Sequence, residues 1–352
     1  MKKLILLLAA MTAVSAYAQK AAEAPERKNW DSKQPLYGNV QSLRVINSTY
    51  DVDSGEFYTE SEESYKFNSR GDVTEKPDTD GNSGYAALYR YKYDANRNVV
   101  ERVSCSATGE VYAKYIYKYN SLGKVAEEFY YHPTDLTNYA SRRHYLYDKK
   151  GLCLGAVDYD SDGSVLSKYD FRYDDQGNRI EETYSRSRYL FEYDGRGNLL
   201  GQHVFEDEVL VERAQFIYDD QDRLIEETLM DGNGVIYEHS TKRYNSQNKP
   251  IEAALYGEGN TLIGTATVTY DSYGKVIKRI DKYQGEEDIV QSFKYDSRGN
   301  LVEHVIDYQE YLQVMAYTYD SHNNLTLKEV FEVYGENTFP TSKTSYEIVY
   351  RQ

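Results

Sequence analysis

The hydrophobic and polar positions of this chain alternate in short segments that recur along its length. Residues 293–303 show the pattern: an aromatic–polar–aromatic run, a turn from Asp296 to Gly299, and then the apolar pair Leu301 and Val302. A period of two is that of a β-strand with two different faces, and Asp followed three residues later by Gly favours a tight turn. Each segment therefore predicts a β-hairpin of two antiparallel strands.

The segment recurs eleven times, about every 25 residues. Its last aromatic residue falls at Phe67, Tyr93, Tyr119, Tyr147, Tyr173, Tyr193, Tyr218, Tyr244, Tyr270, Tyr295 and Tyr319. A fixed period in this range is typical of a repeat array. We therefore expect an all-β fold, in which residues 37–352 form a single antiparallel β-meander of hairpins. Flat open sheets beyond about ten strands are rare, so the long sheet should curl or spiral.

The turn chemistry predicts a register for each hairpin. A type I turn closed by a left-handed Gly and a bulge places Tyr295 opposite Leu301 and Phe293 opposite Glu303. On this prediction the aromatic row and the Glu row share one face, which is the better core candidate, while Lys294 lies on the other face. The Glu recurs in seven copies, so we expect it to accept structural hydrogen bonds, for instance from tyrosine hydroxyls, rather than to form one site. These residues are Glu75, Glu101, Glu127, Glu181, Glu226, Glu252 and Glu303.

The first 18 residues read as a secretory signal. Lys2 and Lys3 precede an apolar run from residue 4 to residue 14, and a small-residue cleavage site ends at Ala18. The apolar run is too short for a membrane span, and no Cys follows it at a lipoprotein position, although an uncleaved anchor is an alternative. We expect a periplasmic or secreted chain without a membrane span, beginning with a flexible N-terminal segment over residues 19–36.

The net charge narrows the classes of partner that we expect for this chain. The 41 basic and 57 acidic residues give a formal net charge of −16, so nucleic acid and anionic membrane surfaces are not expected partners.

Cys105 and Cys153 lie four strands apart in a simple meander, roughly 19 Å at about 4.8 Å per strand. A disulfide needs Cα atoms within about 7 Å, so we expect both thiols to be free.

Few residues suggest chemistry. Asp158, Asp160 and Asp162 match the opening of a calcium loop, but Tyr169 stands where the motif has Glu, and Asp and Gly belong in a turn anyway. Calcium is thus a weak candidate, and no other metal or cofactor is expected. The six His show no metal spacing, and no Gly-x-Ser-x-Gly motif occurs, so we predict no catalytic activity. Tyrosines outside the repeat positions are candidate ligand-binding surface residues, as are the variable turns at the opposite strand ends. These tyrosines are Tyr130, Tyr131, Tyr139, Tyr184 and Tyr311.

Residues 193–199 and 295–301 share the motif Tyr-Asp-x-x-Gly-Asn-Leu. This motif resembles the YD repeat of RHS-repeat proteins, and the resemblance covers roughly residues 65–330. The chain is also similar to exported RHS-like proteins of Bacteroidetes. The resemblance implies long antiparallel sheets that spiral into shells, as in bacterial RHS proteins, insecticidal toxin complexes and teneurins. Neither the RHS core segment nor a C-terminal toxin domain is recognisable in this sequence. The resemblance therefore implies a fold more than an activity.

Three functions are compatible with these observations. The first is a non-catalytic exported binding or scaffold module at the cell envelope or outside the cell, with an envelope protein or a glycan as its partner. The second is a carbohydrate-binding or carbohydrate-active protein that uses tyrosines and carboxylates. The third is a partial RHS-type toxin shell component, which would need a partner chain to complete it.

Overall fold

A computed structural model describes residues 27–30, 34–78 and 87–352. The predicted signal at residues 1–18 and most of the predicted flexible segment lie outside the described residues. The described chain is all-β, as expected, with 24 strands and one short 3₁₀ turn at Glu258–Asn260. Among these residues, no helix has the length and apolar character that crossing a membrane requires. The chain divides into two compact units, each treated separately below.

The N-terminal unit contains the described residues up to 168, together with residues 316–331 and 340–352. Each of its strands pairs antiparallel with the next one along the chain. Its strands are β1 (Val40–Asp51), β2 (Glu56–Phe67), β3 (Val73–Pro77), β4 (Ala87–Tyr93), β5 (Val99–Ser106), β6 (Val111–Tyr119), β7 (Val125–Tyr131), β8 (Ser141–Tyr147) and β9 (Cys153–Asp160).

The central unit contains residues 169–315 and 332–339, and its consecutive strands also pair antiparallel. Its strands are β11 (Arg179–Tyr184), β12 (Ser187–Tyr193), β13 (Leu199–Glu206), β14 (Val209–Tyr218), β15 (Leu224–Asp231), β16 (Ile236–Tyr244), β17 (Pro250–Gly257), β18 (Thr261–Tyr270), β19 (Val276–Tyr283), β20 (Ile289–Tyr295) and β21 (Leu301–Asp307). Four strands contribute residues to both units: β10 (Val165–Tyr173), β22 (Leu312–Tyr319), β23 (Leu325–Tyr334) and β24 (Asn337–Tyr350).

The Tyr-Asp turns have the predicted geometry. The Asp296 amide donates to the Asn300 carbonyl at 2.9 Å, and the Gly299 amide donates to the Asp296 carbonyl at 3.0 Å. Gly299 has φ +91°, in the left-handed region that favours glycine. The Asp side chain closes the turn, since Asp194 accepts hydrogen bonds from Asn198, which lower the pKa of that carboxyl to about 2.

The predicted register is right at the turn and wrong beyond it. Tyr295 pairs with Leu301 as expected, but Phe293 pairs with His304, and Lys294 pairs with Glu303. The reason is a β-bulge directly after Leu301, which adds Val302 to one strand and moves Glu303 to the other face. We call the face that carries Tyr295 and its equivalents the tyrosine face, and the face that carries Lys294 the basic face.

The bulge gives the recurring Glu a different partner from the one predicted. In six copies the Glu forms an ion pair with the Lys or Arg that directly precedes the repeat aromatic residue on the neighbouring strand. These pairs are Lys66–Glu75 (2.9 Å), Lys92–Glu101 (2.6 Å), Lys118–Glu127 (3.3 Å), Arg172–Glu181 (2.6 Å), Lys294–Glu303 (2.6 Å) and Arg243–Glu252. The recurring Glu therefore pairs with a base on the basic face, and the prediction that it accepts a hydrogen bond from a tyrosine hydroxyl is wrong for these six copies.

The repeat tyrosines use their hydroxyls to join successive hairpins. Six of them donate to the backbone carbonyl of the residue that follows the preceding Tyr-Asp turn, at 2.7 to 2.9 Å in five cases. The pairs are Tyr93 with Val73, Tyr119 with Val99, Tyr147 with Val125, Tyr244 with Leu224, Tyr270 with Pro250 and Tyr295 with Val276. That carbonyl lies beside the bulge, where the strand ladder is interrupted, so the hydroxyl supplies its missing donor.

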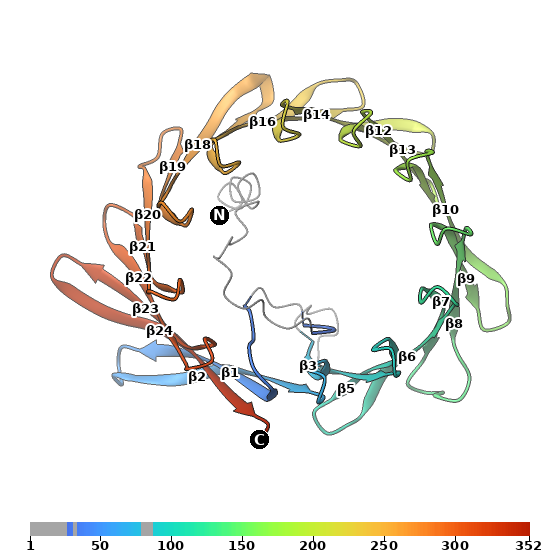
Figure 1. The fold of residues 1–352 in the computed structure, drawn as a ribbon, viewed down its shortest axis with the longest axis horizontal. Coiled ribbons are helices and arrows are strands. Elements are labelled where there is room, and N and C mark those ends of the chain that lie inside the picture. Colours follow the sequence, from blue (N-terminus) through green and yellow to red (C-terminus); the bar gives the residue numbers. More distant parts are fainter. Residues whose placement is uncertain (1–26, 31–33, 79–86) are drawn as a thin grey trace. The chain divides into compact units, whose positions relative to one another are not determined.

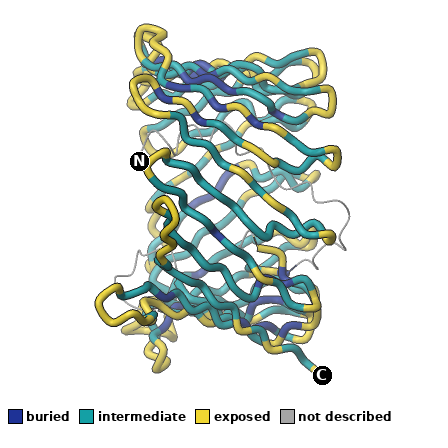
Figure 2. Tube along the Cα trace, turned by 90° about the vertical axis from the view of Figure 1, so that its left-hand side faces the viewer, coloured by how far each residue is buried: buried dark blue, intermediate teal, exposed yellow. Residues whose placement is uncertain are grey.

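The tyrosine face carries the main apolar clusters, as predicted. In the N-terminal unit the cluster is built on Val40, Leu43, Phe67 and Val73, together with Leu36. In the central unit it is built on Ala253, Leu255, Ala266, Val268 and Tyr283. Figure 2 shows most strand residues at intermediate burial and the exposed residues gathered in the turns. Both cysteines are free, as expected, with Cys105 buried and Cys153 partly exposed.

Strands β1 and β24 pair with each other although they are far apart in the sequence. Val40 lies opposite Tyr350, and the antiparallel pairing continues to Thr49 opposite Ser342. Figure 1 shows the blue β1 and β2 beside the red β24. Because β1 also pairs with β2, neither edge of β1 is free. Residues 38–40 and 350–351 thus form a hairpin end from two distant segments, which we call the seam hairpin.

Candidate functional site

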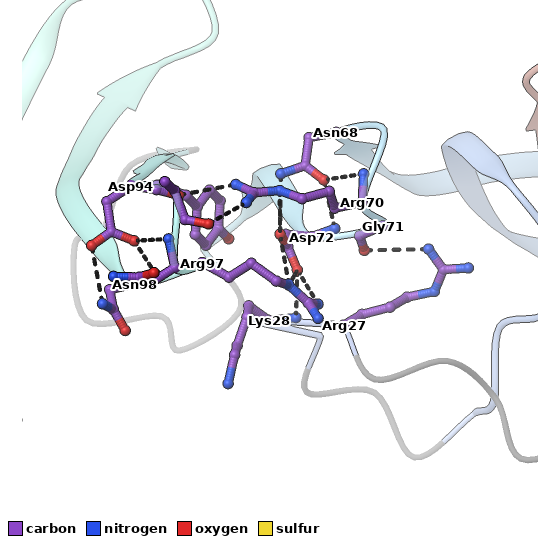
Figure 3. Close-up of polar contacts among 12 residues, drawn as sticks. Arg27, Lys28, Asn68, Arg70, Gly71, Asp72, Asp94, Arg97 and Asn98 are labelled. Atoms are coloured by element: carbon purple, nitrogen blue, oxygen red, sulfur yellow. Dashed lines mark hydrogen bonds and ion pairs between the residues drawn. The ribbon is translucent and has the colours of Figure 1, made fainter. Parts of the chain in front are cut away.

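A buried carboxylate joins the segment around residue 28 to the first two repeat turns. Asp72 is fully buried, and Arg97 contacts both of its carboxylate oxygens. Asn68 and the Lys28 amide also donate to this carboxylate (Figure 3). Burial pushes the pKa of Asp72 up, but these hydrogen bonds outweigh it and hold the pKa below its usual range. The group is fully partnered, so it is a structural clamp rather than a reactive carboxylate.

Arg27 holds the same segment to the strands without a carboxylate. Its guanidinium donates to the carbonyls of Leu36, Gly38 and Gly71 at 2.8 to 3.2 Å. It also stacks over the Phe67 ring, 5.3 Å from the ring centre to Cζ. The residues of this segment that the structure describes therefore pack onto the tyrosine face of the N-terminal unit.

The same packing leaves a cavity of about 170 Å³ beneath Trp30. The Trp30 ring lies edge-on to Tyr65, with ring centres 5.4 Å apart, and its Nε1 donates to the Gln34 carbonyl. Leucine, valine and isoleucine side chains from β1, β23 and β24 line the apolar part. Glu63 adds a carboxylate that accepts a hydrogen bond from the Tyr65 hydroxyl at 2.9 Å. Burial, together with this carboxylate, raises the pKa of Tyr346 in the cavity wall.

The five tyrosines predicted as surface contacts have different aromatic or cationic neighbours. Tyr130 packs against Tyr115 and Tyr139 against Phe129, while Tyr131 lies under the Lys114 ammonium, all within the N-terminal unit. In the central unit, Tyr184 stacks on Tyr169 with ring centres 4.7 Å apart and is 42% exposed.

The fifth, Tyr311, lies in a row of aromatic rings in the central unit. It stacks between Tyr308 and Tyr334 at 5.0 and 5.2 Å, and Phe339 continues the row. Tyr334 is 44% and Phe339 is 49% exposed, so this row offers aromatic surface to a partner. A role in binding stays a prediction for all five tyrosines.

The weak calcium candidate has other partners in the structure. Asp158 receives two hydrogen bonds from Arg143, at 2.6 and 2.8 Å, and one from the Ser167 hydroxyl. Asp160 and Asp162 each accept a backbone amide of their own turn. Within the part of the chain that the structure describes, no group of three or more His, Cys, Asp or Glu side chains is placed to hold a metal ion.

No protein-family model matches the sequence, and no curated protein matches it. Among solved structures the chain is similar to the Tc holotoxin pore of Photorhabdus luminescens, with 13% identity over 86% of this chain and a TM-score of 0.45. It is also similar to the TcdB2-TccC3-Cdc42 complex, with 13% identity over 87% of the chain and a TM-score of 0.44. The chain spans 17% of the matched chain in each case.

A third similar structure is a porin-like protein from Bacteroides uniformis, with 12% identity over 88% of this chain and 96% of that one, and a TM-score of 0.23. Likeness at these levels assigns no function to this chain. The resemblance to the RHS repeat therefore rests on the sequence motif itself.

Sequence reasoning did not find the cavity or the Asp72 clamp. The signal that was available is the only tryptophan, Trp30, followed by Leu36 in an otherwise polar stretch. Such residues are unusual in a flexible lead-in, and they are the ones that reach the tyrosine face. Asp72 gave no comparable signal, because in sequence it is one more polar residue of a repeat turn.

Proposed function

We propose that the protein is an exported, non-catalytic binding module that holds one sugar residue of an envelope or extracellular glycan in the cavity beneath Trp30. The observation that carries this proposal is the lining of the cavity, which combines flat aromatic rings with a single carboxylate. Tryptophan and tyrosine rings pack against the C–H faces of a pyranose, and a carboxylate accepts hydrogen bonds from its hydroxyls. The volume of about 170 Å³ suits one six-membered ring.

The placement of the carboxylates supports binding without catalysis. Glycoside hydrolysis usually needs two carboxyl groups across the scissile bond. The described lining of the cavity has one, Glu63, and it is hydrogen-bonded to Tyr65. In the part of the chain that the structure describes, the buried carboxylates elsewhere are paired with arginines, Asp72 with Arg97 and Asp281 with Arg279.

Trp30 makes the site testable, because the only tryptophan of the chain forms a wall of the cavity. We expect neutral envelope oligosaccharides to change its fluorescence in a saturable way. Trp30→Phe should weaken binding measured by calorimetry, and Glu63→Gln should weaken it by roughly tenfold through the loss of a charged hydrogen-bond acceptor. Tyr273→Phe is the matched control, since it alters a tyrosine of the central unit that is 67% exposed and is not among the candidate binding residues.

Two results would overturn this assignment. One is glycan binding that is unaffected in both the Trp30 and the Glu63 variants. The other is turnover of the glycan that disappears with a single Asp or Glu substitution. A saturable response to aromatic peptides with none to glycans would identify an envelope protein as the partner instead.

Export is part of the proposal and has its own test. Export is proposed because basic residues, an apolar run and a small-residue cleavage site at Ala18 follow one another at the start of the chain. Intact-mass analysis of protein from its native host should give a chain beginning at Gln19, in the periplasm or the medium. A cytoplasmic chain that retains Lys2 would contradict export and leave the cavity assignment untouched.

A component of an RHS-type shell is the second candidate, and the repeated Tyr-Asp turn favours it. A partner chain could not add a strand to β1, because β2 and β24 occupy both of its edges. Crosslinking in the native host should therefore capture a cargo or partner protein bound elsewhere. A chain that crosslinks to no protein would count against the shell and not against glycan binding.

A further inference from the structure

The tyrosine face carries four strand arginines, and one of them differs from the rest. The register places Arg102, Arg143, Arg179 and Arg279 on this face. Arg143 is paired with Asp158 at 2.6 Å, Arg179 with Glu182 at 2.8 Å, and Arg279 with Asp281 at 2.7 Å. For Arg102, no ion pair or hydrogen bond is found among the described residues.

The surroundings of Arg102 leave its charge without an acceptor. It lies in the middle of β5, opposite Tyr91 on β4 and Tyr115 on β6. Its Cζ is 4.2 Å from the ring centre of Tyr115 and 5.7 Å from that of Tyr89. Its Nε is buried and has no hydrogen-bond partner. An unmet donor of this kind is costly, and stacking on rings does not supply the acceptor that a guanidinium fork needs.

Neighbouring groups add donors and one acceptor. Burial raises the pKa of Tyr117, so its hydroxyl stays a neutral hydrogen-bond donor. Glu128 lies opposite Tyr117, and no ion pair between Glu128 and Arg102 is found among the described residues. Glu128 instead accepts a hydrogen bond from the Tyr145 hydroxyl, at 3.4 Å. The group thus offers a cation for an anion and a carboxylate for hydroxyls.

We propose that Arg102, with Tyr89, Tyr115 and Tyr117, binds the carboxylate of a hexuronic acid residue. The guanidinium matches a carboxylate in a two-point contact, which an uncharged sugar cannot provide. The tyrosine rings pack along the pyranose, and Glu128 accepts from a ring hydroxyl. A free inorganic anion would leave the rings and Glu128 without a role. This site is distinct from the Trp30 cavity and does not depend on it.

The test compares galacturonate with galactose, which differ only in the carboxylate. We expect calorimetry to detect galacturonate and to find galactose bound at least tenfold more weakly. Arg102→Gln should weaken galacturonate binding on the order of 30-fold, the range of a charged hydrogen-bonded contact. Arg102→Lys should give an intermediate loss, because an ammonium keeps the charge and lacks the fork. Arg179→Gln is the matched control, an arginine of the same face that already has a carboxylate, and it should bind as the parent does.

Four other outcomes would each overturn the proposal, provided that the variants are folded. Circular dichroism first establishes that the variants are folded, and the Lys variant serves if the Gln variant is not. Equal binding of galacturonate by the parent and a folded Arg102 variant would exclude this residue. Acetate binding as tightly as galacturonate would exclude the sugar, and Arg102-dependent binding of an aspartate-rich peptide alone would replace the glycan by a protein. A change in Trp30 fluorescence with galacturonate would place the ligand in the cavity instead.

Discussion

At an internal repeat and at the seam hairpin, different side chains donate a hydrogen bond to the backbone carbonyl beside the bulge. At the internal repeat, the Tyr119 hydroxyl donates to the Val99 carbonyl at 2.7 Å. At the seam, Val40 occupies the place of Val99, and Phe67 occupies the place of Tyr119 but has no hydroxyl. Arg351 supplies the donor instead, since its Nη1 lies 2.7 Å from the Val40 carbonyl. The requirement is thus a partner for the carbonyl beside the bulge, and tyrosine is one way to provide it.

The backbone of the seam hairpin also copies an internal turn without a covalent connection. The Arg351 amide donates to the Asn39 carbonyl at 2.8 Å, as the Asn120 amide donates to Lys124 at 2.9 Å. Gly38 has φ +80° and Gly123 has φ +71°. An unlinked turn must hold two segments in place at an entropic cost that a linked turn avoids. Asn324 offsets part of that cost by hydrogen bonding both backbone groups of Tyr37.

The largest expected effect is unfolding at alkaline pH. The internal repeats share a titratable tyrosine hydroxyl, whereas the seam has Phe67 at the equivalent position. Burial raises the pKa of Tyr93 to about 12 and also raises those of Tyr119, Tyr147, Tyr244, Tyr270 and Tyr295. A raised native pKa means that the stabilisation is complete below the unfolded value near 10 and is lost as pH rises through the native value.

We therefore expect cooperative loss of β-structure between about pH 10 and 12, well before arginine deprotonates. Tyrosinate absorbance at alkaline pH, recorded with far-ultraviolet circular dichroism, is the measurement. Ionisation of all 39 tyrosines, the six repeat tyrosines included, near pH 10 in a still-folded chain would contradict the account of the hydroxyls.

The second expected effect comes from the clamp beside the seam. Asp72→Ala should lower the free energy of unfolding by about 3 to 5 kcal/mol, because Arg97 and the Lys28 amide lose a buried partner. Denaturant titration measures it. The pKa of Asp72 is lowered, so its contribution is complete above about pH 4 and is lost as pH falls below that value. Asp271→Ala is the control, an aspartate of an internal turn, and an equal cost there would show that the clamp adds nothing.

The third prediction compares the two donors to the carbonyl beside the bulge, the Tyr119 hydroxyl and the Arg351 guanidinium. Tyr119→Phe should cost about 1 to 2 kcal/mol by leaving the Val99 carbonyl without its donor. Arg351→Ala should cost a similar amount through Val40. Phe67→Tyr should bring no gain, because Arg351 already occupies the acceptor. If Phe67→Tyr stabilises the parent as much as it rescues Arg351→Ala, the arginine is not the substitute for the hydroxyl.

The repeat hairpins were predictable from sequence because their signal is local. Asp296 and Gly299 determine the turn, and period-two alternation determines the faces. The bulge at Val302 was missed because the extra residue is apolar, as is its neighbour Leu301, so the pattern does not reveal which of them is unpaired. The hydrogen bonds of Asp72 with Arg97 and of the Val40 carbonyl with Arg351, like the ring contact of Arg102 with Tyr115, join different strands or distant parts of the chain. No local pattern encodes them.

The smallest expected effect concerns the basic face, where the repeats differ little from one another. Lys92 and Glu101 form an ion pair at 2.6 Å, but the lysine side chain is 72% exposed. Water and salt screen such a pair, so Lys92→Ala should cost less than about 0.5 kcal/mol, well below the cost of Tyr119→Phe. A double-mutant cycle with Glu101→Gln isolates the pair, and its coupling should shrink further at about 1 M salt. A coupling equal to that of a tyrosine hydroxyl would mean that the ion pairs, rather than the hydroxyls, join the hairpins.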